Sequence, residues 1–278
     1  MTPAHPTDRD AITDFLSRHI LSSMFPLSNL TRYGMGGGHP HATRFWVIRR
    51  AGRITDVLGL TGSGMVLPQC PTEPWQAARD TLSGARVTGI VGAADQVRPL
   101  SEALGLSRHK MSISADEPQY ALDLERLVIP DGPGRLIPAT AAHLPVLLDW
   151  RAAYQMETLG QSAETARVNA ASTVSGWIEE GSHMILTDGK DPLALTGINA
   201  SAMSVVQVGG VYTPPALRRR GHARRAVALH LAQLRDAGRA DRATLFAASE
   251  AAARAYITIG FHHIGTFTIS LLKEPAHV

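Results

Sequence analysis

The feature that most constrains the fold is a strand that leads directly into a glycine-containing turn and then into a helix. Residues 205–213 are rich in valine, and Pro214 and Pro215 then end the strand because neither has an amide hydrogen for a sheet ladder. Helical spacing follows over residues 221–237, with Gly221 at the start. A helix that begins just after a strand presents unpaired amide hydrogens at its first turn, so an anion site is expected there.

The segments around this turn predict a mixed sheet flanked by helices. Short runs rich in β-branched residues alternate with helical spacing, and turn residues separate them. The elements expected in the second half are, in order, strand 135–138, helices 141–156 and 163–180, strands 183–187, 193–199 and 205–213, helix 221–237, strand 243–247, helix 249–259 and strand 261–272. The expected fold class is α/β of the α+β kind, with a mostly antiparallel sheet.

The first half of the chain predicts a shorter version of the same order. Its expected elements are a helix over 10–23, a strand meander over 43–69, a helix over 74–82, a strand over 87–91 and a helix over 94–104. The stretch from Val128 to Gly134 is then dense in turn residues. We therefore expect two domains, residues 1–126 and residues 127–278.

Composition limits the classes of protein to which the chain can belong. With 278 residues, 44% of them hydrophobic, it can bury a full core. Its single cysteine, Cys70, excludes an internal disulfide framework, and no metal-ligand spacing such as CxxC accompanies it. There is no secretory signal and no apolar stretch of about 18 residues, so we expect a cytoplasmic protein that binds neither a metal nor a membrane.

One motif in the turn carries a family resemblance. Arg218-x-x-Gly221-x-Ala223, preceded by its strand, is similar to the signature R/Q-x-x-G-x-G/A of the GNAT superfamily of acyl-CoA-dependent N-acetyltransferases. The resemblance implies the GNAT fold for residues 127–278 and a smaller, degenerate GNAT-like α/β domain for residues 1–126, as in a tandem GNAT protein.

A second motif follows at the spacing of the same superfamily. The pattern N-x-x-A/S-x-x-x-Y-x-x-x-G-F resembles the segment Ser249-x-x-Ala252-x-x-x-Tyr256-x-x-x-Gly260-Phe261. Ser249 replaces the usual asparagine, which removes one hydrogen bond expected near the cofactor. Two motifs separated by a helix and a strand are more specific than a lone glycine motif.

The resemblance implies an activity and a set of site residues. The activity is transfer of an acetyl group from acetyl-CoA to a primary amine of a small molecule, peptide or protein, by direct attack in a ternary complex without a metal. Tyr256 is the candidate acid that protonates the departing thiolate. The residues implied in cofactor binding are Val211, Tyr212 and Thr213 along the pantetheine arm, Arg218, Arg219, Arg220, Gly221, His222, Ala223 and Arg224 around the pyrophosphate, and Ser249.

No general base can be named from the sequence. Gln207 lies where some relatives carry a glutamate, and an amide cannot take a proton. Glu157, Glu179 and Glu180 lie in regions that often wall the acceptor site, and each is interpreted first as a surface carboxylate. The amine itself, the acyl preference and the choice between monomer and homodimer stay open.

Two other functions stay open. The missing carboxylate at Gln207 permits a non-catalytic acyl-CoA-binding module. The basic run 218–225 permits a nucleic-acid-binding protein, but the run is interrupted at phosphate-turn spacing and no aromatic residues interleave for base stacking. In the first half, the segment 89–94 is expected to take the place of the phosphate turn without its arginine–glycine pattern, so this half should not bind CoA.

Overall fold

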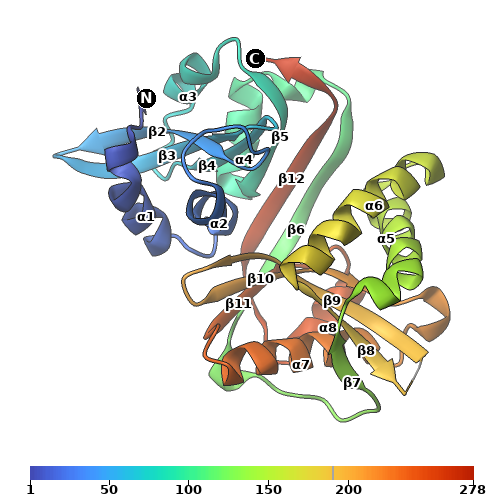
Figure 1. Cartoon of the computed structure of the whole chain (residues 1–278). Helices are drawn as coiled ribbons and strands as arrows, with labels where there is room; N and C mark the ends of the chain where they lie inside the picture. The colour runs from blue at the N-terminus through green and yellow to red at the C-terminus, as the bar shows by residue number, and fades with distance from the viewer. Residues whose placement is uncertain (190) are drawn as a thin grey trace. The chain divides into compact units, whose positions relative to one another are not determined.

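The computed structural model describes residues 1–189 and 191–278, which form two compact units (Figure 1). The first unit comprises Met1–Glu117 and Gly265–Val278, and the second comprises Pro118–Ile264. The chain passes between them within strands β6 (Met111–Asp123) and β12 (His262–His277). The units therefore differ in extent from the expected domains 1–126 and 127–278, because the last residues of the chain lie with the first unit.

The first unit is a twisted sheet with helices packed against it. Strand β5 (Arg86–Ala93) pairs in parallel with β4 and antiparallel with β12, whose register runs from Phe267↔Ala93 to His277↔Arg86. The other strands, β1 (Thr2–Pro3), β2 (Thr43–Arg50), β3 (Arg53–Thr61) and β4 (Met65–Gln69), form antiparallel pairs in chain order. Ala51 and Gly52, both with positive φ, form the tight turn between β2 and β3.

Four α-helices and two short 3-10 helices complete this unit. Their bounds are η1 (Pro6–Asp8), α1 (Arg9–Arg18), α2 (Met24–Tyr33), α3 (Trp75–Leu82), α4 (Ala94–Ala103) and η2 (Leu106–Arg108). The helix expected over 10–23 ends at Arg18, and the separate helix α2 was not predicted. One core cluster joins fully buried residues of β3–β5 to α3 and α4, among them Leu58, Ile90, Leu82 and Leu100.

From residue 135 to residue 257 the second unit has the element order that the sequence predicts, whereas strand β6 was not predicted and most of the last expected strand, β12, lies in the first unit. The sheet of the second unit runs β6-β11-β10-β9-β8-β7, with β10 and β11 parallel and the other pairs antiparallel. The strands are β7 (Arg135–Pro138), β8 (His183–Asp188), β9 (Asp191–Ala202), β10 (Val205–Tyr212) and β11 (Arg242–Phe246). The helices are η3 (Leu124–Arg126), η4 (Ala141–His143), α5 (Leu144–Leu159), α6 (Ala163–Glu180), η5 (Pro215–Leu217), α7 (His222–Asp236) and α8 (Glu250–Ile257).

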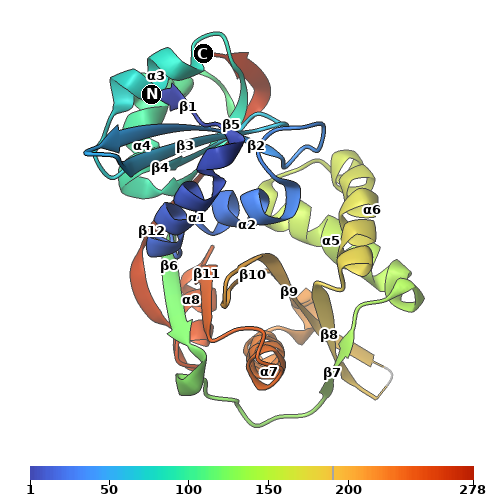
Figure 2. The same ribbon diagram turned by 60° about the vertical axis from the view of Figure 1, so that its left-hand side comes forward.

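Alternation along the strands of this unit gives each face of the sheet its own helices. Ile185 on β8 packs in a cluster with residues of α5 and α6, whereas the next residue, Leu186, packs with Ala226 of α7. Val208 and Leu245 join a third cluster with residues of α7 and α8. In Figure 2, α7 is seen nearly end-on on one side of the sheet, and α5 and α6 lie on the other.

The two units repeat one arrangement, which corrects the expectation for segment 89–94. In each unit, a parallel strand pair is joined through a helix: β4-α3-β5 in the first and β10-α7-β11 in the second. The counterpart of the phosphate turn is therefore the β4–α3 turn, residues 70–74. Segment 89–94 instead forms the end of β5 and the start of α4, at the place of the later β11–α8 connection.

The β4–α3 turn is closed by contacts within the unit. The fully buried carboxylate of Asp56 accepts hydrogen bonds from Thr72 N at 2.9 Å and from Thr72 Oγ1 at 2.7 Å. Glu73 adds a second carboxylate and Pro74 precedes the helix. An acidic turn without glycine is unfavourable for a phosphate. That the first unit does not bind CoA stays a prediction.

Candidate functional site

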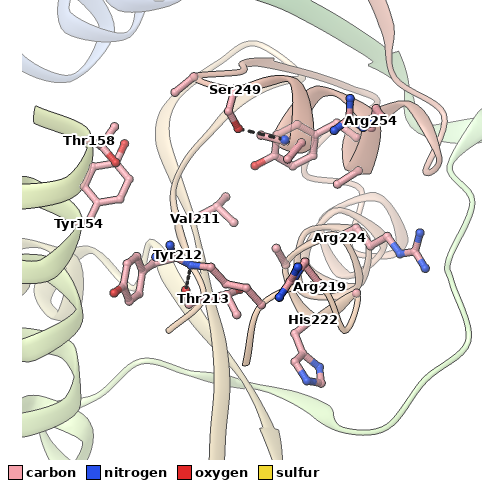
Figure 3. A pocket seen from close by; sticks show the side chains of 18 of the residues that line it. Tyr154, Thr158, Val211, Tyr212, Thr213, Arg219, His222, Arg224, Ser249 and Arg254 are labelled. Atoms are coloured by element: carbon pink, nitrogen blue, oxygen red, sulfur yellow. Dashed lines mark hydrogen bonds between the residues drawn. The ribbon is translucent and has the colours of Figure 1, made fainter. Parts of the chain in front are cut away.

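A cavity of about 850 Å³ opens in the second unit where β10, the turn before α7, α8 and the end of α5 meet (Figure 3). Every residue that the sequence singles out for catalysis or cofactor binding lines this cavity. Tyr154, Glu157 and Thr158 of α5 form its opposite wall. The sequence placed only Glu157 of these in a region that often walls the acceptor site, and interpreted it first as a surface carboxylate. The structure thus brings the predicted residues together, while their individual roles stay predictions.

The end of β10 separates from its neighbour at the cavity. Pairing with β11 runs from Val205↔Arg242 to Val208↔Leu245 and does not continue, although β10 extends to Tyr212. On the other side the register with β9 shifts between Gly209 and Tyr212. In the described part of the chain, Gly210 and Val211 have no register partner in either strand. Backbone groups at this bulge are therefore placed to pair with an extended ligand instead.

The turn before α7 forms a cradle for an anion. Gly221 is the residue before the helix and has φ +81°, in the left-handed region that favours glycine. No side chain caps the first turn of α7, and no acidic residue lies in it. The first amide hydrogens of α7 are therefore available to a ligand, at the positive end of the helix dipole.

Arginine side chains surround this cradle. Among the described residues, Arg219, Arg220 and Arg224 form no ion pair, and the buried Nε of Arg224 has no hydrogen-bond partner. Burial, and next the charge of Arg220, lower the pKa of His222. The turn therefore carries a positive charge that the protein does not neutralise, which suits a pyrophosphate.

Arg218 differs from its neighbours because the protein itself binds its guanidinium group. Arg218 donates to Glu157 Oε2 at 2.5 Å and to the Thr213 carbonyl oxygen at 2.9 Å. Glu157 also accepts from the Tyr212 hydroxyl at 3.2 Å, and burial followed by this carboxylate raises the pKa of Tyr212. Arg218 thus fastens the turn to α5, and a contact of Arg218 with phosphate stays a prediction.

Helix α8 supplies the remaining predicted residues. Ser249 is the N-cap of α8, where its hydroxyl accepts from Ala252 N at 3.2 Å (Figure 3). Tyr256 lies within the core cluster around α7 and α8 and is 8% exposed. Its ring packs edge-on against the Phe261 ring, with 6.0 Å between the ring centres. Its side chain is nevertheless part of the cavity wall.

One acidic residue reaches the cavity. Glu157 is the only aspartate or glutamate on the wall among the described residues, although its side chain is 40% exposed. Glu179, Glu180 and the buried Gln207 do not line it. Helical spacing could have identified this wall, because Tyr154, Glu157 and Thr158 lie three and four residues apart on one face of α5.

Two features are absent from the part of the chain that the structure describes. No group of three or more histidine, cysteine, aspartate or glutamate side chains is arranged to hold a metal ion. No described helix is both long enough and apolar enough to span a membrane.

Solved structures that share this fold include GNAT acetyltransferases. A GCN5-related N-acetyltransferase from Kribbella flavida matches over 92% of this chain and 95% of its own, with a TM-score of 0.59 and 17% identity. One from Sphaerobacter thermophilus matches over 97% and 93%, with a TM-score of 0.55 and 15% identity. A tandem GNAT protein from the clavulanic acid biosynthesis pathway matches over 99% and 98%, with a TM-score of 0.52 and 15% identity.

These matches confirm the predicted fold class. The chain has the GNAT fold, and the tandem GNAT protein matches it along nearly its whole length. No protein-family model matches the sequence, and no curated protein matches it.

Proposed function

We propose that the chain is an N-acetyltransferase that moves an acetyl group from acetyl-CoA to a primary amine of a small molecule, peptide or protein. One observation carries the proposal: the separated end of β10 and the uncapped, arginine-rich start of α7 line the same cavity. Fold similarity supports acyl transfer only by analogy, so the site must carry the argument. A volume of about 850 Å³ lies in the usual range of ligand sites.

The cofactor-binding residues divide by the part of CoA that they would hold. The backbone of Val211, Tyr212 and Thr213 would pair with the pantetheine arm, and the amides from Arg219 to Arg224 would hold the pyrophosphate. The unpaired guanidinium groups of the turn add charge-assisted hydrogen bonds. Acetyl-CoA supplies the activated acyl carbon.

The transfer needs one group that takes a proton and one that gives a proton. Glu157 is the carboxylate on the cavity wall, so we assign to it the proton that the incoming ammonium must lose. The free amine then attacks the thioester carbonyl carbon, the carbon–nitrogen bond forms and the carbon–sulfur bond breaks. Tyr256 donates its hydroxyl proton to the sulfur and is reprotonated, through solvent, by the second proton that the nitrogen loses as the amide forms, while Glu157 releases the first proton to solvent.

A calorimetric titration of acetyl-CoA into the purified protein tests the cofactor site. In Gly221→Val, a side chain enters the cradle, where a Cβ would lie 3.2 Å from Arg224 Nε, and we expect the affinity to fall at least roughly tenfold because amide contacts to an anion are lost. Gly238→Val is the matched control: Gly238 has φ +66° at the other end of α7, with no atom near its Cβ position.

The outcomes separate the candidate functions. Saturable binding by the parent and by Gly238→Val, lost in Gly221→Val, supports the proposal. An equal loss in both variants would trace the effect to backbone strain and remove this support. Absence of binding to the parent would overturn the proposal, whereas binding without turnover of any amine would favour the non-catalytic acyl-CoA-binding module.

A further inference from the structure

Both carboxylate oxygens of Glu157 accept a hydrogen bond from a residue of the cavity wall. The Tyr212 hydroxyl donates to Oε1 at 3.2 Å, and the Arg218 guanidinium group donates to Oε2 at 2.5 Å. The Glu157 side chain is 40% exposed, so packing alone would leave its torsion angles free to vary. The two donors therefore fix the orientation of this carboxylate.

Arg218 is in turn fixed by the end of β10. Its Nε donates to the Thr213 carbonyl oxygen at 2.9 Å, and its guanidinium carbon lies 5.7 Å from the centre of the Tyr212 ring. One edge of the guanidinium group thus binds the backbone and another binds Glu157, an arrangement that suits its rigid fork of donors. These contacts direct the group toward α5.

The ion pair between Arg218 and Glu157 contributes little to the stability of the fold. The two side chains are 43% and 40% exposed, and pairs that are this open to solvent stabilise a protein only weakly. The main effect of the pair is therefore geometric. It joins the turn before α7 to Glu157, the only acidic side chain that the described residues place on the cavity wall.

The other arginines of the turn have no acidic partner to leave. Among the described residues, Arg219, Arg220 and Arg224 form no ion pair, and Figure 3 shows Arg219 and Arg224 beside α7. To reach a phosphate, Arg218 would have to give up its hydrogen bonds to Glu157 and to a backbone carbonyl. The three unpaired arginines are therefore the better ligands for a phosphate in this turn.

We propose that Arg218 is a positioning residue that holds Glu157 as the proton acceptor, and that it is not a ligand of the pyrophosphate. The inference rests on the proposed function, in which Glu157 takes the proton that the incoming ammonium loses. Each carboxylate oxygen keeps a second lone pair, so Glu157 can accept from the ammonium while both donors stay in place. Orienting the carboxylate in advance lowers the entropic cost of the transfer. The proposal departs from the GNAT resemblance, which places Arg218 around the pyrophosphate.

Calorimetric titration of CoA tests whether Arg218 binds phosphate. Arg218→Gln should bind CoA within about twofold of the parent, because the pyrophosphate loses no ligand. Arg224→Gln should bind CoA at least about tenfold more weakly, because a charge-assisted hydrogen bond is lost. A similar loss in both variants would make Arg218 a phosphate ligand and overturn the inference.

Turnover of primary amines tests the positioning role. Release of the CoA thiol is followed with benzylamine, tyramine, putrescine and glycinamide, and the amine with the highest rate is then used for every variant. Arg218→Gln should lower kcat about tenfold or more while the KM for acetyl-CoA stays constant. Arg218→Lys should recover part of the rate, because lysine keeps the charge and a donor. Arg254→Gln removes from the same wall an arginine that is paired with Glu250, and it should keep the parent kcat.

A double-mutant cycle shows whether Arg218 acts through Glu157. Glu157→Gln alone should lower kcat about 100-fold or more, and adding Arg218→Gln should lower it no further, because the group that Arg218 orients is gone. Losses that multiply would place the role of Arg218 outside this contact and overturn the inference. If Arg218→Gln does not fold, as judged by its thermal transition, Arg218→Met takes its place, since it keeps an unbranched stem beside the Tyr212 ring.

The failure of this inference differs from the failure of the proposed function. An unchanged kcat in Arg218→Gln would overturn the positioning role while the parent still binds acetyl-CoA and acetylates an amine. A parent that does not bind acetyl-CoA, or that acetylates no amine of the panel, would instead count against the proposed function, and the inference would fall with it.

Discussion

A methyl group at Gly197 should destabilise the second unit by colliding with the His183 ring. Gly197 on β9 is the register partner of His183 on β8, and the imidazole lies over the glycine. A Cβ built there would lie 2.1 Å from Nε2, 2.3 Å from Cδ2 and 2.5 Å from Cε1. All three separations are far below van der Waals contact. The ring cannot move aside easily, because Trp177 stacks on it and it is 1% exposed.

The expected cost follows from overpacking in a closed space. Forcing a methyl group into a packed core costs about 1–3 kcal/mol. For a unit of this size, each kcal/mol lowers the midpoint of thermal unfolding by roughly 2–4 °C. Gly197→Ala should therefore lower the midpoint of the second unit by about 2–12 °C. Gly176→Ala in α6, which meets no atom within 4 Å, is the control and should be neutral or slightly stabilising.

A double-mutant cycle identifies the collision as the cause. In a His183→Ser background the ring is gone, so Gly197→Ala should cost little, and the coupling free energy should reach at least about 1 kcal/mol. The assay is differential scanning calorimetry, because two units can unfold in separate transitions. The reasoning is refuted if Gly197→Ala behaves like Gly176→Ala, or if it costs the same with and without the imidazole.

Two further predictions concern protons. Burial lowers the pKa of His183 from 6.5 to about 3 and that of His230 to about 4. Below pH 6.5 the unfolded chain therefore binds protons that the folded chain does not. As the pH decreases, the free energy of unfolding should decrease by up to about 1.4 kcal/mol per pH unit for each histidine. Urea unfolding near pH 7 and pH 5 should show a smaller loss in His230→Gln than in the parent; equal losses would contradict this. Tyr256→Phe should lower kcat about 100-fold or more while the KM for acetyl-CoA stays constant, and a retained kcat would remove Tyr256 as the acid.

The second unit could be predicted well because its elements carry uninterrupted patterns. The run from Val205 through the paired prolines to the helix after Gly221 indicated a strand, a turn and a helix from local chemistry alone. The residues expected around the cofactor therefore line one cavity. Glu157 was expected at the surface, and its contacts with Tyr212 and Arg218 depend on how α5 packs against the turn.

The elements that could not be predicted depend on pairing between distant segments. Strand β6 contains Pro118 and alternates half-buried with exposed residues over 111–118, and its partner β11 follows more than a hundred residues later. Helix α2 has Pro26 in its first turn, where periodicity gives little signal. The bulge at Gly210 and the unpaired Nε2 of His183 depend on the registers of three strands, which no local pattern encodes.

The pairing of the C-terminal strand β12 with β5 of the first unit has a consequence for biosynthesis. Strand β5 pairs with β12, so the sheet of the first unit is incomplete until residues 267–277 have left the ribosome. The edge of β5 must meanwhile stay unpaired while the second unit is translated, and it could template wrong pairing during that interval. A chain divided near residue 126 would leave β5 with an open edge, and a truncation before β12 would do the same. The sheet of the first unit thus depends on the last strand of the chain, even though each unit has its own core.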